Sequence, residues 1–137
     1  MKTSLQTPTF KFALREDLQD TGDLFLPTKA EELSSGWDVK AAQKNRKDLI
    51  IKPGEYFKIP LGFRAIPENG WWYQLHPRSS SFAKKRMHCL IGTIDESYEG
   101  ELLLAGQHIV DSKELLATDC VLRIKFGDAV AQIIPVK

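Results

Sequence analysis

The strongest constraint on the fold is a series of short runs of branched and aromatic residues separated by turn residues. Such runs recur along the whole chain, and pairs such as Pro53-Gly54 and Gly127-Asp128 lie between them. Branched and aromatic side chains favour strands, whereas Gly, Pro, Asn and Asp favour turns. Short strands at this spacing are typical of sandwiches and barrels rather than of alternating strand and helix units. The sequence therefore predicts an all-β fold.

The run boundaries predict where the elements lie. Strands are expected at 9–14, 24–26, 37–41, 49–51, 56–60, 62–66, 72–76, 89–94, 101–104, 121–126 and 130–136. Residues 79–86 alone have helical character, with Ser79 as the cap, so one short helix is expected there. Residues 16–35 and 111–119 are polar with interspersed Leu, and we expect them to be surface loops.

Length and charge limit the classes of protein. A chain of 137 residues suits a single domain spanning 1–137, which buries about two thirds of its unfolded surface without metal or disulfide support. Lys and Arg number 19 against 18 Asp and Glu, a net charge of +1, which argues against binding to long nucleic acid. Without a signal peptide or a membrane-length apolar run, a cytoplasmic location is expected. Cys89 and Cys120 are then expected as buried thiols.

Residues 92–100 place one carboxylate and one aromatic ring between two glycines. Asp95 follows the apolar Ile94, where strand packing would favour another apolar residue, and Tyr98 lies just beyond. The glycines at the two ends predict a hairpin with positive φ or with a close approach of a ligand to the main chain. This stretch is therefore expected to flank a small bound molecule.

A possible anion site lies at 76–84, where an arginine and several hydroxyls fall between a strand and the expected helix. Arg78, Ser79 and Ser80 follow one another there. Backbone N–H groups at a helix start, together with an Arg fork, suit phosphate. The alternative is a simple Ser cap beside solvated basic residues, and the residues alone leave both interpretations open.

Two more polar residues interrupt apolar strands. Asp38 follows Gly36 at a strand start, where it could contact a hydrated Mg²⁺, which usually takes only one or two protein carboxylates. An Asx-turn is the alternative for Asp38. Gln132 lies within the apolar run 130–136. A buried amide there must be hydrogen-bonded, to a ligand or to neighbouring backbone.

Four stretches, in order along the chain, resemble the first four motifs of the trimeric deoxyuridine triphosphatases (dUTPases). They are Gly36-Trp-Asp-Val-Lys-Ala41, Pro77-Arg-Ser-Ser80, Gly92-Thr-Ile-Asp-Glu-Ser-Tyr-Glu-Gly100 and Gly127-Asp-Ala-Val-Ala-Gln132. The resemblance covers the chain from Gly36 to its end. It implies a jelly-roll-like β-clip domain, a homotrimer, and active sites assembled at subunit contacts from motifs of different chains.

The resemblance also implies a reaction, the hydrolysis of dUTP to dUMP and pyrophosphate with Mg²⁺. Asp95 would be the general base that activates water, and Tyr98 would lie beneath the deoxyribose and exclude ribonucleotides. Asp38 would hold the metal through water. The substrate-binding residues implied are Arg78, Ser79, Ser80 and Gln132 for the phosphates, and Cys89, Thr93 and Ile94 near the base.

The chain departs from the family pattern at three places. Cys89 stands where an Asn is usual, in a connection one residue shorter than in relatives, and Ala129 stands where an Arg is usual. The sequence ends at Lys137, before the family's glycine-rich fifth motif. Two explanations are open. Either a flexible arm continues beyond this sequence, which we favour, or the protein ends here and hydrolyses dUTP slowly.

Other functions fit less well. A nucleotide-binding signalling protein with weak turnover, as some phage members are thought to be, is the main alternative, although Asp95 would repel a triphosphate in a pure binder. A dCTP deaminase is disfavoured because Ala105 occupies the position of its catalytic Glu and because Tyr98 is present. A zinc-dependent deaminase is disfavoured because His76, His88 and His108 lack ligand spacing. The expected location is the cytoplasm, that of the host if the gene belongs to a phage.

Overall fold

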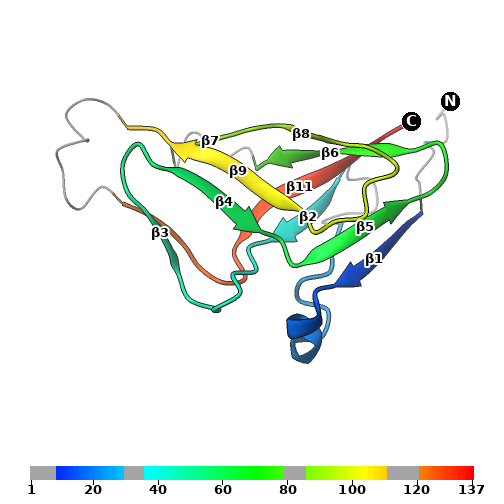
Figure 1. The fold of residues 1–137 in the computed structure, drawn as a ribbon, viewed down its shortest axis with the longest axis horizontal. Helices are drawn as coiled ribbons and strands as arrows, with labels where there is room; N and C mark the ends of the chain where they lie inside the picture. The colour runs from blue at the N-terminus through cyan, green and yellow to red at the C-terminus, as the bar shows by residue number, and fades with distance from the viewer. Residues whose placement is uncertain (1–8, 30–35, 79–85, 111–120) are drawn as a thin grey trace, which may run out of the picture.

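A computed structural model of the chain describes residues 9–29, 36–78, 86–110 and 121–137, which form eleven strands and one 3-10 helix (Figure 1). In chain order the elements are β1 (Phe10–Leu14), η1 (Glu16–Thr21), β2 (Trp37–Lys40), β3 (Leu49–Ile51), β4 (Tyr56–Pro60), β5 (Phe63–Pro67), β6 (Trp72–Pro77), β7 (Met87–Cys89), β8 (Gly92–Ile94), β9 (Leu103–His108), β10 (Leu122–Ile124) and β11 (Ala129–Val136). The all-β prediction is confirmed.

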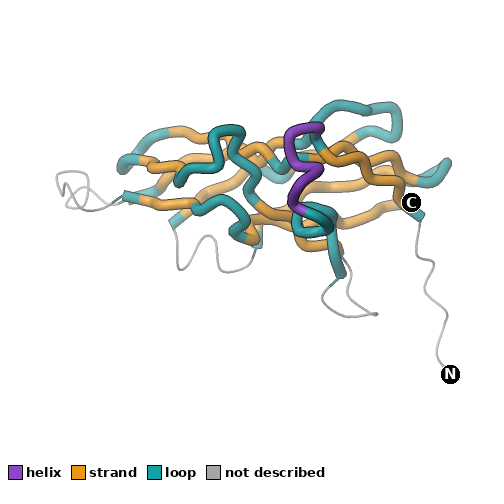
Figure 2. The backbone as a smooth tube through the Cα atoms, turned by 90° about the horizontal axis from the view of Figure 1, so that it is seen from below, coloured by secondary structure: helices purple, strands orange, loops and turns teal. Residues whose placement is uncertain are grey.

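The strands pair in antiparallel fashion into two larger sheets and two short pairs. One larger sheet has the order β2-β11-β6-β8 and the other has the order β4-β9-β7. The pairs are β1 with β5 and β10 with β3. Seen from below, the strands run along the long axis and η1 lies across them on one side (Figure 2). The chain has a jelly-roll-like β fold.

The core forms because apolar and polar residues alternate along the strands. In β4, Phe57 and Ile59 are buried while Tyr56 and Lys58 are exposed, as the two-residue period of a strand requires. Inward side chains from the larger sheets and from the short pairs join one cluster, in which Ile59, Phe63 and Tyr73 are fully buried. Each such side chain contributes about 1.5–3 kcal/mol by burial, so this cluster determines the positions of the strands.

The segment 16–29 docks through a second, smaller core. Leu18, Phe25 and Ala42 are buried together, and the Phe25 ring lies 4.8 Å from that of Phe126. The strand expected at 24–26 is wrong, because these residues form turns in which the Leu26 N–H donates to the Asp23 carbonyl at 3.2 Å. The neighbouring Leu24 is exposed while Phe25 is buried.

Two other strand predictions need correction. The expected strand 89–94 is two strands in different sheets, separated at Leu90 and Ile91, which are both exposed. The expected strand 101–104 is β9, which begins at Leu103 and continues through Gly106 to His108. The remaining expected strands differ from the observed ones mainly in their ends. Residues 79–85 of the helix expected at 79–86 and the loop expected at 111–119 lie outside the described residues, and Arg86 is not helical.

Two smaller expectations concern the cysteines and the membrane. Cys89 is a free, buried thiol, as expected, while Cys120 lies outside the described residues. Within the ranges given above, no helix has both the length and the apolar character needed to cross a membrane.

Candidate active site

Three polar side chains from three adjacent strands form a row, here called the polar row: Asp38, Gln132 and His76. Asp38 on β2 lies opposite Gln132 on β11, and Gln132 lies opposite His76 on β6. Directly opposed residues of antiparallel strands point to the same face, with Cβ atoms about 5 Å apart. The row is partly exposed, whereas the alternating neighbours are buried, namely Val39, Ile133 and Leu75. The sheet therefore presents a carboxylate, an amide and an imidazole side by side.

A β-bulge in β11 sets the register of this row. Ala129 pairs with Lys40 and Ala131 pairs with Val39, so β11 has one extra residue there, Val130. Val130 and Ala131 are both buried, and the bulge restores alternation so that Gln132 faces outward. Arg78, just after β6, donates from Nη1 to the Ala129 carbonyl at 3.2 Å. A guanidinium has five N–H donors, so this bond occupies only part of its capacity.

Gly36 allows β2 to lie close to β11. A Cβ built at Gly36 would stand 2.6 Å from the Ile133 carbonyl oxygen and 2.6 Å from Ile134 Cδ1. Real Cβ atoms do not approach a carbonyl so closely, so any side chain here would push the two strands apart. The glycine before Asp38 thus serves the polar row.

Residues 92–100 form a crossing between sheets, and the predicted hairpin is wrong. β8 pairs with β6, whereas the next strand, β9, pairs with β4 and β7. Asp95 follows β8 and is exposed, and its carbonyl accepts the Tyr98 N–H at 3.0 Å. Glu96 Oε1 accepts the Gly70 N–H at 3.1 Å. The segment is therefore held by a turn at Asp95 and by a bond to the neighbouring loop.

The two glycines of this segment differ in what they permit. The prediction of positive φ fails for both Gly92 and Gly100. A Cβ at Gly92 would meet ordinary contacts at 3.7 Å. At Gly100 a Cβ would stand 2.4 Å from the Tyr98 hydroxyl oxygen. The Tyr98 hydroxyl donates to the Glu101 carbonyl at 2.9 Å. Gly100 is needed because the tyrosine ring folds back over it.

Two titratable groups lie beneath or beside this segment. Tyr73 on β6 pairs with Ile94 and is fully buried, and its hydroxyl has no hydrogen-bond partner within the described ranges. Burial raises the pKa of Tyr73, and the nearby Tyr98 adds to the effect. Burial also raises the pKa of Cys89 to about 11. The Cys89 thiol is 7% exposed and packs in the main core, so at neutral pH it is a protonated apolar side chain.

The chain separates the expected site residues into two groups. Asp38, Gln132 and Arg78 lie near one end of β6, where Pro77 pairs with Ala131. Asp95 and Tyr98 follow Ile94, which pairs with Tyr73 near the other end. Position 78 is five residues beyond 73, which at ~3.3 Å per residue is roughly 17 Å along the strand. Ser79 and Ser80 lie outside the described residues.

Sequence reasoning missed the place of His76. Its Nε2 lies 2.8 Å from Gln74 Oε1 on the same strand face, and it completes the polar row. The signal was the alternation of polar Gln74 and His76 with apolar Tyr73 and Leu75, which indicates that one face of β6 is polar.

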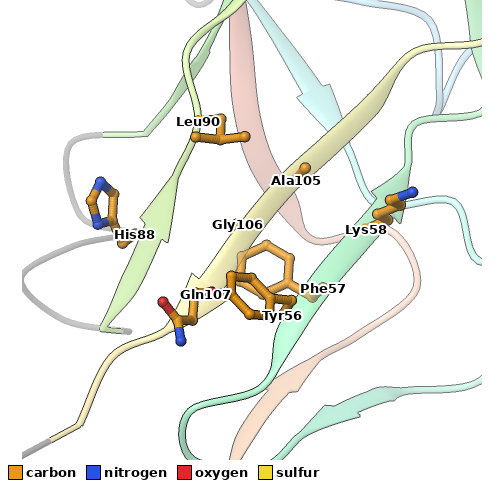
Figure 3. Close-up of a pocket in the computed structure, with 8 residues that line it drawn as sticks. All are labelled: Tyr56, Phe57, Lys58, His88, Leu90, Ala105, Gly106 and Gln107. Atoms are coloured by element: carbon orange, nitrogen blue, oxygen red, sulfur yellow. The ribbon is translucent and has the colours of Figure 1, made fainter.

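A hollow of about 610 Å³ lies on the other larger sheet (Figure 3). Its lining is Tyr56, Phe57, Lys58, His88, Leu90, Ala105, Gly106 and Gln107. Tyr56 is 82% exposed and Leu90 is 68% exposed. Among the described residues the lining holds no carboxylate, so they do not include the Asp95 expected as general base, and their apolar character is that of a contact surface.

The described residues contain no group of three or more His, Cys, Asp or Glu side chains that could hold a metal ion. Mg²⁺ keeps several waters and is commonly bound by one or two carboxylates together with substrate phosphates. A lone, partly exposed Asp38 beside the Gln132 amide fits that mode of binding. The donor set is therefore compatible with a hydrated Mg²⁺ that arrives with a polyphosphate.

No protein-family model matches the chain. Curated proteins named deoxyuridine 5'-triphosphate nucleotidohydrolase do match. The protein of Finegoldia magna is 32% identical over 112 residues, which are 80% of this chain and 71% of the relative. That of Zymomonas mobilis is 30% identical over 114 residues, which are 82% of this chain and 70% of the relative.

For other relatives the match covers about half of their length. The protein of Agrobacterium fabrum is 34% identical over 87 residues, 62% of this chain and 56% of the relative. The corresponding share is 46% of the relative for Bartonella bacilliformis. The shared region is therefore only part of those proteins.

Solved structures share the fold. A mutant dUTPase of Staphylococcus bacteriophage 80alpha with dUpNHpp has a TM-score of 0.76 at 19% identity, covering 95% of this chain and 90% of that one. The dUTPase of Streptococcus mutans has a TM-score of 0.73 at 23% identity, covering 91% and 93%. A mutant dUTPase of phage phi11, described with a structural Mg(II) ion, has a TM-score of 0.72 at 20% identity, covering 93% and 90%. Because the two bacterial relatives from Finegoldia and Zymomonas match most of their own length at 30% identity or more, the chain belongs to the deoxyuridine 5'-triphosphate nucleotidohydrolase family.

Proposed function

We propose that the chain hydrolyses dUTP to dUMP and pyrophosphate. Water attacks the α-phosphorus, the bond from that phosphorus to the bridging oxygen breaks, and pyrophosphate leaves. Membership of the family supports this reaction. The observation that carries the proposal is the register of β2 and β11, which sets the Asp38 carboxylate beside the Gln132 amide near Arg78. That arrangement suits an anionic polyphosphate with its cation.

The polar row and Arg78 bind the triphosphate in this proposal. Arg78 donates to phosphate oxygens with the N–H groups that the Ala129 carbonyl does not use. Gln132 donates from its amide, and Ser79 and Ser80 complete the phosphate contacts. Asp38 would hold a hydrated Mg²⁺ through water, and the ion would neutralise charge on the triphosphate. The protein here mainly positions the reacting groups.

Residues 92–100 bind the nucleoside and supply the base. Asp95 accepts the proton of the attacking water. Tyr98 lies beneath the deoxyribose, where a 2′-hydroxyl would collide with its ring. Main-chain groups of Thr93 and Ile94 read the uracil edge, since an N–H aimed at O4 would be left unpaired by cytosine. Cys89 contributes as the buried support of the strand that leads to this segment.

A second copy of the chain completes each site. The roughly 17 Å between the Tyr73 and Arg78 levels of β6 keeps Asp95 away from Arg78 within one protomer. Exposed apolar side chains on the β4-β9-β7 face, among them Tyr56 and Leu90, suit a contact between copies. We propose a homotrimer in which Asp95 of one protomer serves the polar row of another. The cytoplasmic location stays a prediction.

Single-turnover hydrolysis of dUTP with Mg²⁺ tests the function. Asp95→Asn should reduce the rate by roughly 10²–10⁴-fold while the affinity for dUpNHpp, measured by calorimetry, is retained. Glu99→Gln is the matched control, because Glu99 is an exposed acid of the same segment, and it should hydrolyse at the wild-type rate. Equal rates in wild type and Asp95→Asn would refute the catalytic role and favour a nucleotide-binding signalling protein instead.

A further inference from the structure

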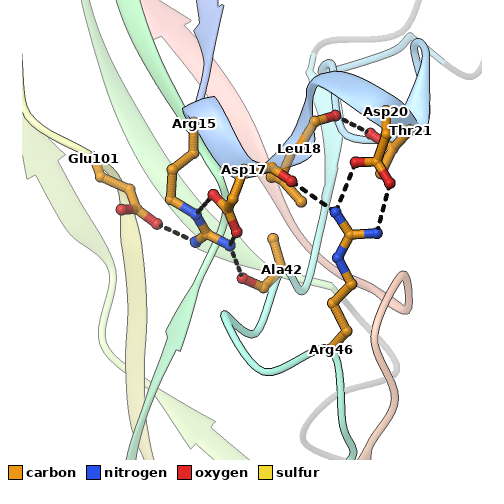
Figure 4. A network of polar contacts seen from close by, with 8 residues as sticks. All are labelled: Arg15, Asp17, Leu18, Asp20, Thr21, Ala42, Arg46 and Glu101. Atoms are coloured by element: carbon orange, nitrogen blue, oxygen red, sulfur yellow. Dashed lines mark hydrogen bonds and ion pairs between the residues drawn. The ribbon is translucent and has the colours of Figure 1, made fainter.

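Arg15 connects the N-terminal part of the chain to the end of the 92–100 segment. It lies between β1 and η1, and its side chain is 13% exposed. Nη1 donates to Glu101 Oε1 at 2.8 Å, and Nη2 donates to the Ala42 carbonyl at 2.8 Å. Nε and Nη2 also donate to the two carboxylate oxygens of Asp17 (Figure 4). The guanidinium is thus fixed by three partners and holds Glu101 in one orientation.

Glu101 in turn holds Tyr98. The Glu101 carboxylate is 28% exposed and faces Arg15, while its main-chain carbonyl accepts the Tyr98 hydroxyl at 2.9 Å. The next residue, Leu102, is buried and pairs with the chain around β5, with its N–H donating to the Phe63 carbonyl at 3.3 Å. Two contacts therefore set the position of the Glu101 peptide. One is the bond of the next residue, Leu102, to Phe63, and the other is the ion pair of the Glu101 side chain with Arg15.

We propose that Arg15 is a positioning residue for Tyr98, acting through Glu101 to keep the tyrosine ring where it excludes a ribose 2′-hydroxyl. The inference rests on the proposed function, because it assumes that Tyr98 lies beneath the sugar. Arg15 does not touch the nucleotide in this scheme. It fixes the end of the segment at Glu101, whose carbonyl accepts the hydrogen bond of the Tyr98 hydroxyl. A ring that can tilt accepts the extra oxygen of a ribonucleotide.

Arg46 provides a matched control. Its guanidinium donates to both carboxylate oxygens of Asp20 at 2.9 and 2.7 Å and to the Asp17 carbonyl at 2.6 Å (Figure 4). It therefore ties the same 3-10 helix to the body of the protein with a similar set of bonds. Among the described residues, the Arg46 guanidinium donates hydrogen bonds to Asp17 and Asp20 of η1 and to no residue of 92–101. A purely structural role of η1 would make the two arginines equivalent.

The experiment compares Arg15→Lys, Glu101→Gln and Arg46→Lys in the full chain. Lysine keeps the charge of Arg15 but cannot reproduce the forked contacts, and glutamine keeps the shape of Glu101. We expect the ratio of kcat/KM for dUTP to that for UTP to fall about tenfold in Arg15→Lys and Glu101→Gln, as is typical for residues in one hydrogen-bond network. The double variant should lose no more than either single one, and Arg46→Lys should keep the wild-type ratio.

A second readout does not depend on the nucleotide. The Tyr98 amide donates to the Asp95 carbonyl, and its hydrogen exchange should become about tenfold faster in Arg15→Lys but not in Arg46→Lys. Equal behaviour of the two arginine variants in both measurements would overturn the inference while leaving dUTP hydrolysis intact. If wild type does not hydrolyse dUTP, the proposed function fails, and unchanged Tyr98 exchange in Arg15→Lys would then reject the positioning role as well.

Discussion

The polar row and the 92–100 segment are two parts of one proposed site, and they are built in different ways. Asp38, Gln132 and His76 are positioned by the register of three paired strands, whose inward neighbours fill the core. Asp95 and Tyr98 lie on a crossing held by a few contacts at Glu96, Tyr98 and Glu101. The polar row therefore forms with the strand pairing of the fold itself, whereas the 92–100 segment can shift without unfolding the protein.

The largest expected effect comes from placing a substitution in each of the two parts, at Arg78 and at Asp95, on different chains. Arg78→Ala and Asp95→Asn should each lose roughly 10²-fold or more of the dUTP hydrolysis rate. When the two variants are co-refolded in equal amounts, about a quarter of sites in a cyclic trimer receive intact Arg78 from one chain and intact Asp95 from the next. Steady-state hydrolysis should recover to that level. No recovery would show that both residues act within one protomer.

The reactivity of Cys89 tests how often β7, the strand before the 92–100 segment, opens to solvent. Because burial raises its pKa to about 11, the thiolate fraction at pH 8 is about 100-fold below that of a thiol with the ordinary value of 9.0. Alkylation by iodoacetamide, followed by peptide mass spectrometry, should be slower by at least that factor in the native protein than in denaturant. Equal rates would mean that the strand before the segment opens readily.

Gly36→Ala should lower the free energy of unfolding by disturbing the sheet that carries the polar row. The added Cβ would collide with the Ile133 carbonyl in the neighbouring strand, and overpacking of this kind costs about 1–3 kcal/mol. Urea unfolding measures the loss. Gly92→Ala is the control, because its Cβ would meet only ordinary contacts at 3.7 Å. A Gly36→Ala protein as stable as wild type would show that β2 and β11 can separate.

Gly100→Ala should affect selectivity more than stability. The new Cβ would meet the Tyr98 hydroxyl end, which is the far end of a side chain that can rotate. We expect the free energy of unfolding to change by less than about 0.5 kcal/mol, while the preference for dUTP over UTP falls several-fold. A large loss of stability with unchanged preference would mean that the segment is as rigid as the sheet.

The smallest expected effect concerns Asp17, which shares Arg15 with Glu101 at the end of the 92–100 segment. The hydrogen bond from Arg15 lowers the pKa of Asp17 below its ordinary value of 3.8. The resulting stabilisation is present above pH 3.8 and is lost as the pH falls through the lower folded-state pKa. Because Asp17 is 43% exposed, Asp17→Asn should cost less than about 1 kcal/mol at pH 7.

The Asp17→Asn difference should shrink as the pH falls from 7 to 2.5. Urea unfolding of both proteins at the two pH values measures it. A difference of the same size at the lower pH would point to packing rather than to the ion pair.

The sequence predicted the strands well where apolar and polar residues alternate, as in β4. The prediction failed where apolar residues lie outside strands, in the second core or on an exposed surface. At 24–26 a single ring, Phe25, fills the second core. Leu90 and Ile91 are exposed between two sheets, and sequence alone does not distinguish an apolar contact surface from a core. Gly106 has low strand propensity, yet β9 needs it, because a Cβ there would stand 2.5 Å from the His88 carbonyl.

The candidate site residues remain predictions, and their arrangement in the fold was not predicted from the sequence. Motif spacing indicated Asp38, Gln132 and Arg78, yet their proximity depends on pairing between strands distant in sequence and on the bulge at Val130. The contact between Arg15 and Glu101 also joins remote positions, and neither residue belongs to a motif. Long-range pairing is decided by the whole core, which local patterns do not encode.

The bulge at Val130 limits how this chain can change in evolution. Removing or adding one residue between Ala129 and Gln132 would turn the amide inward and bring an aliphatic side chain outward. Substitutions in β11 should therefore be tolerated more readily than a change in the number of residues between Ala129 and Gln132. The segment 16–29 is attached through Leu18 and Phe25, so a change in its length should be tolerated when these two anchors and the Arg15 contact are kept.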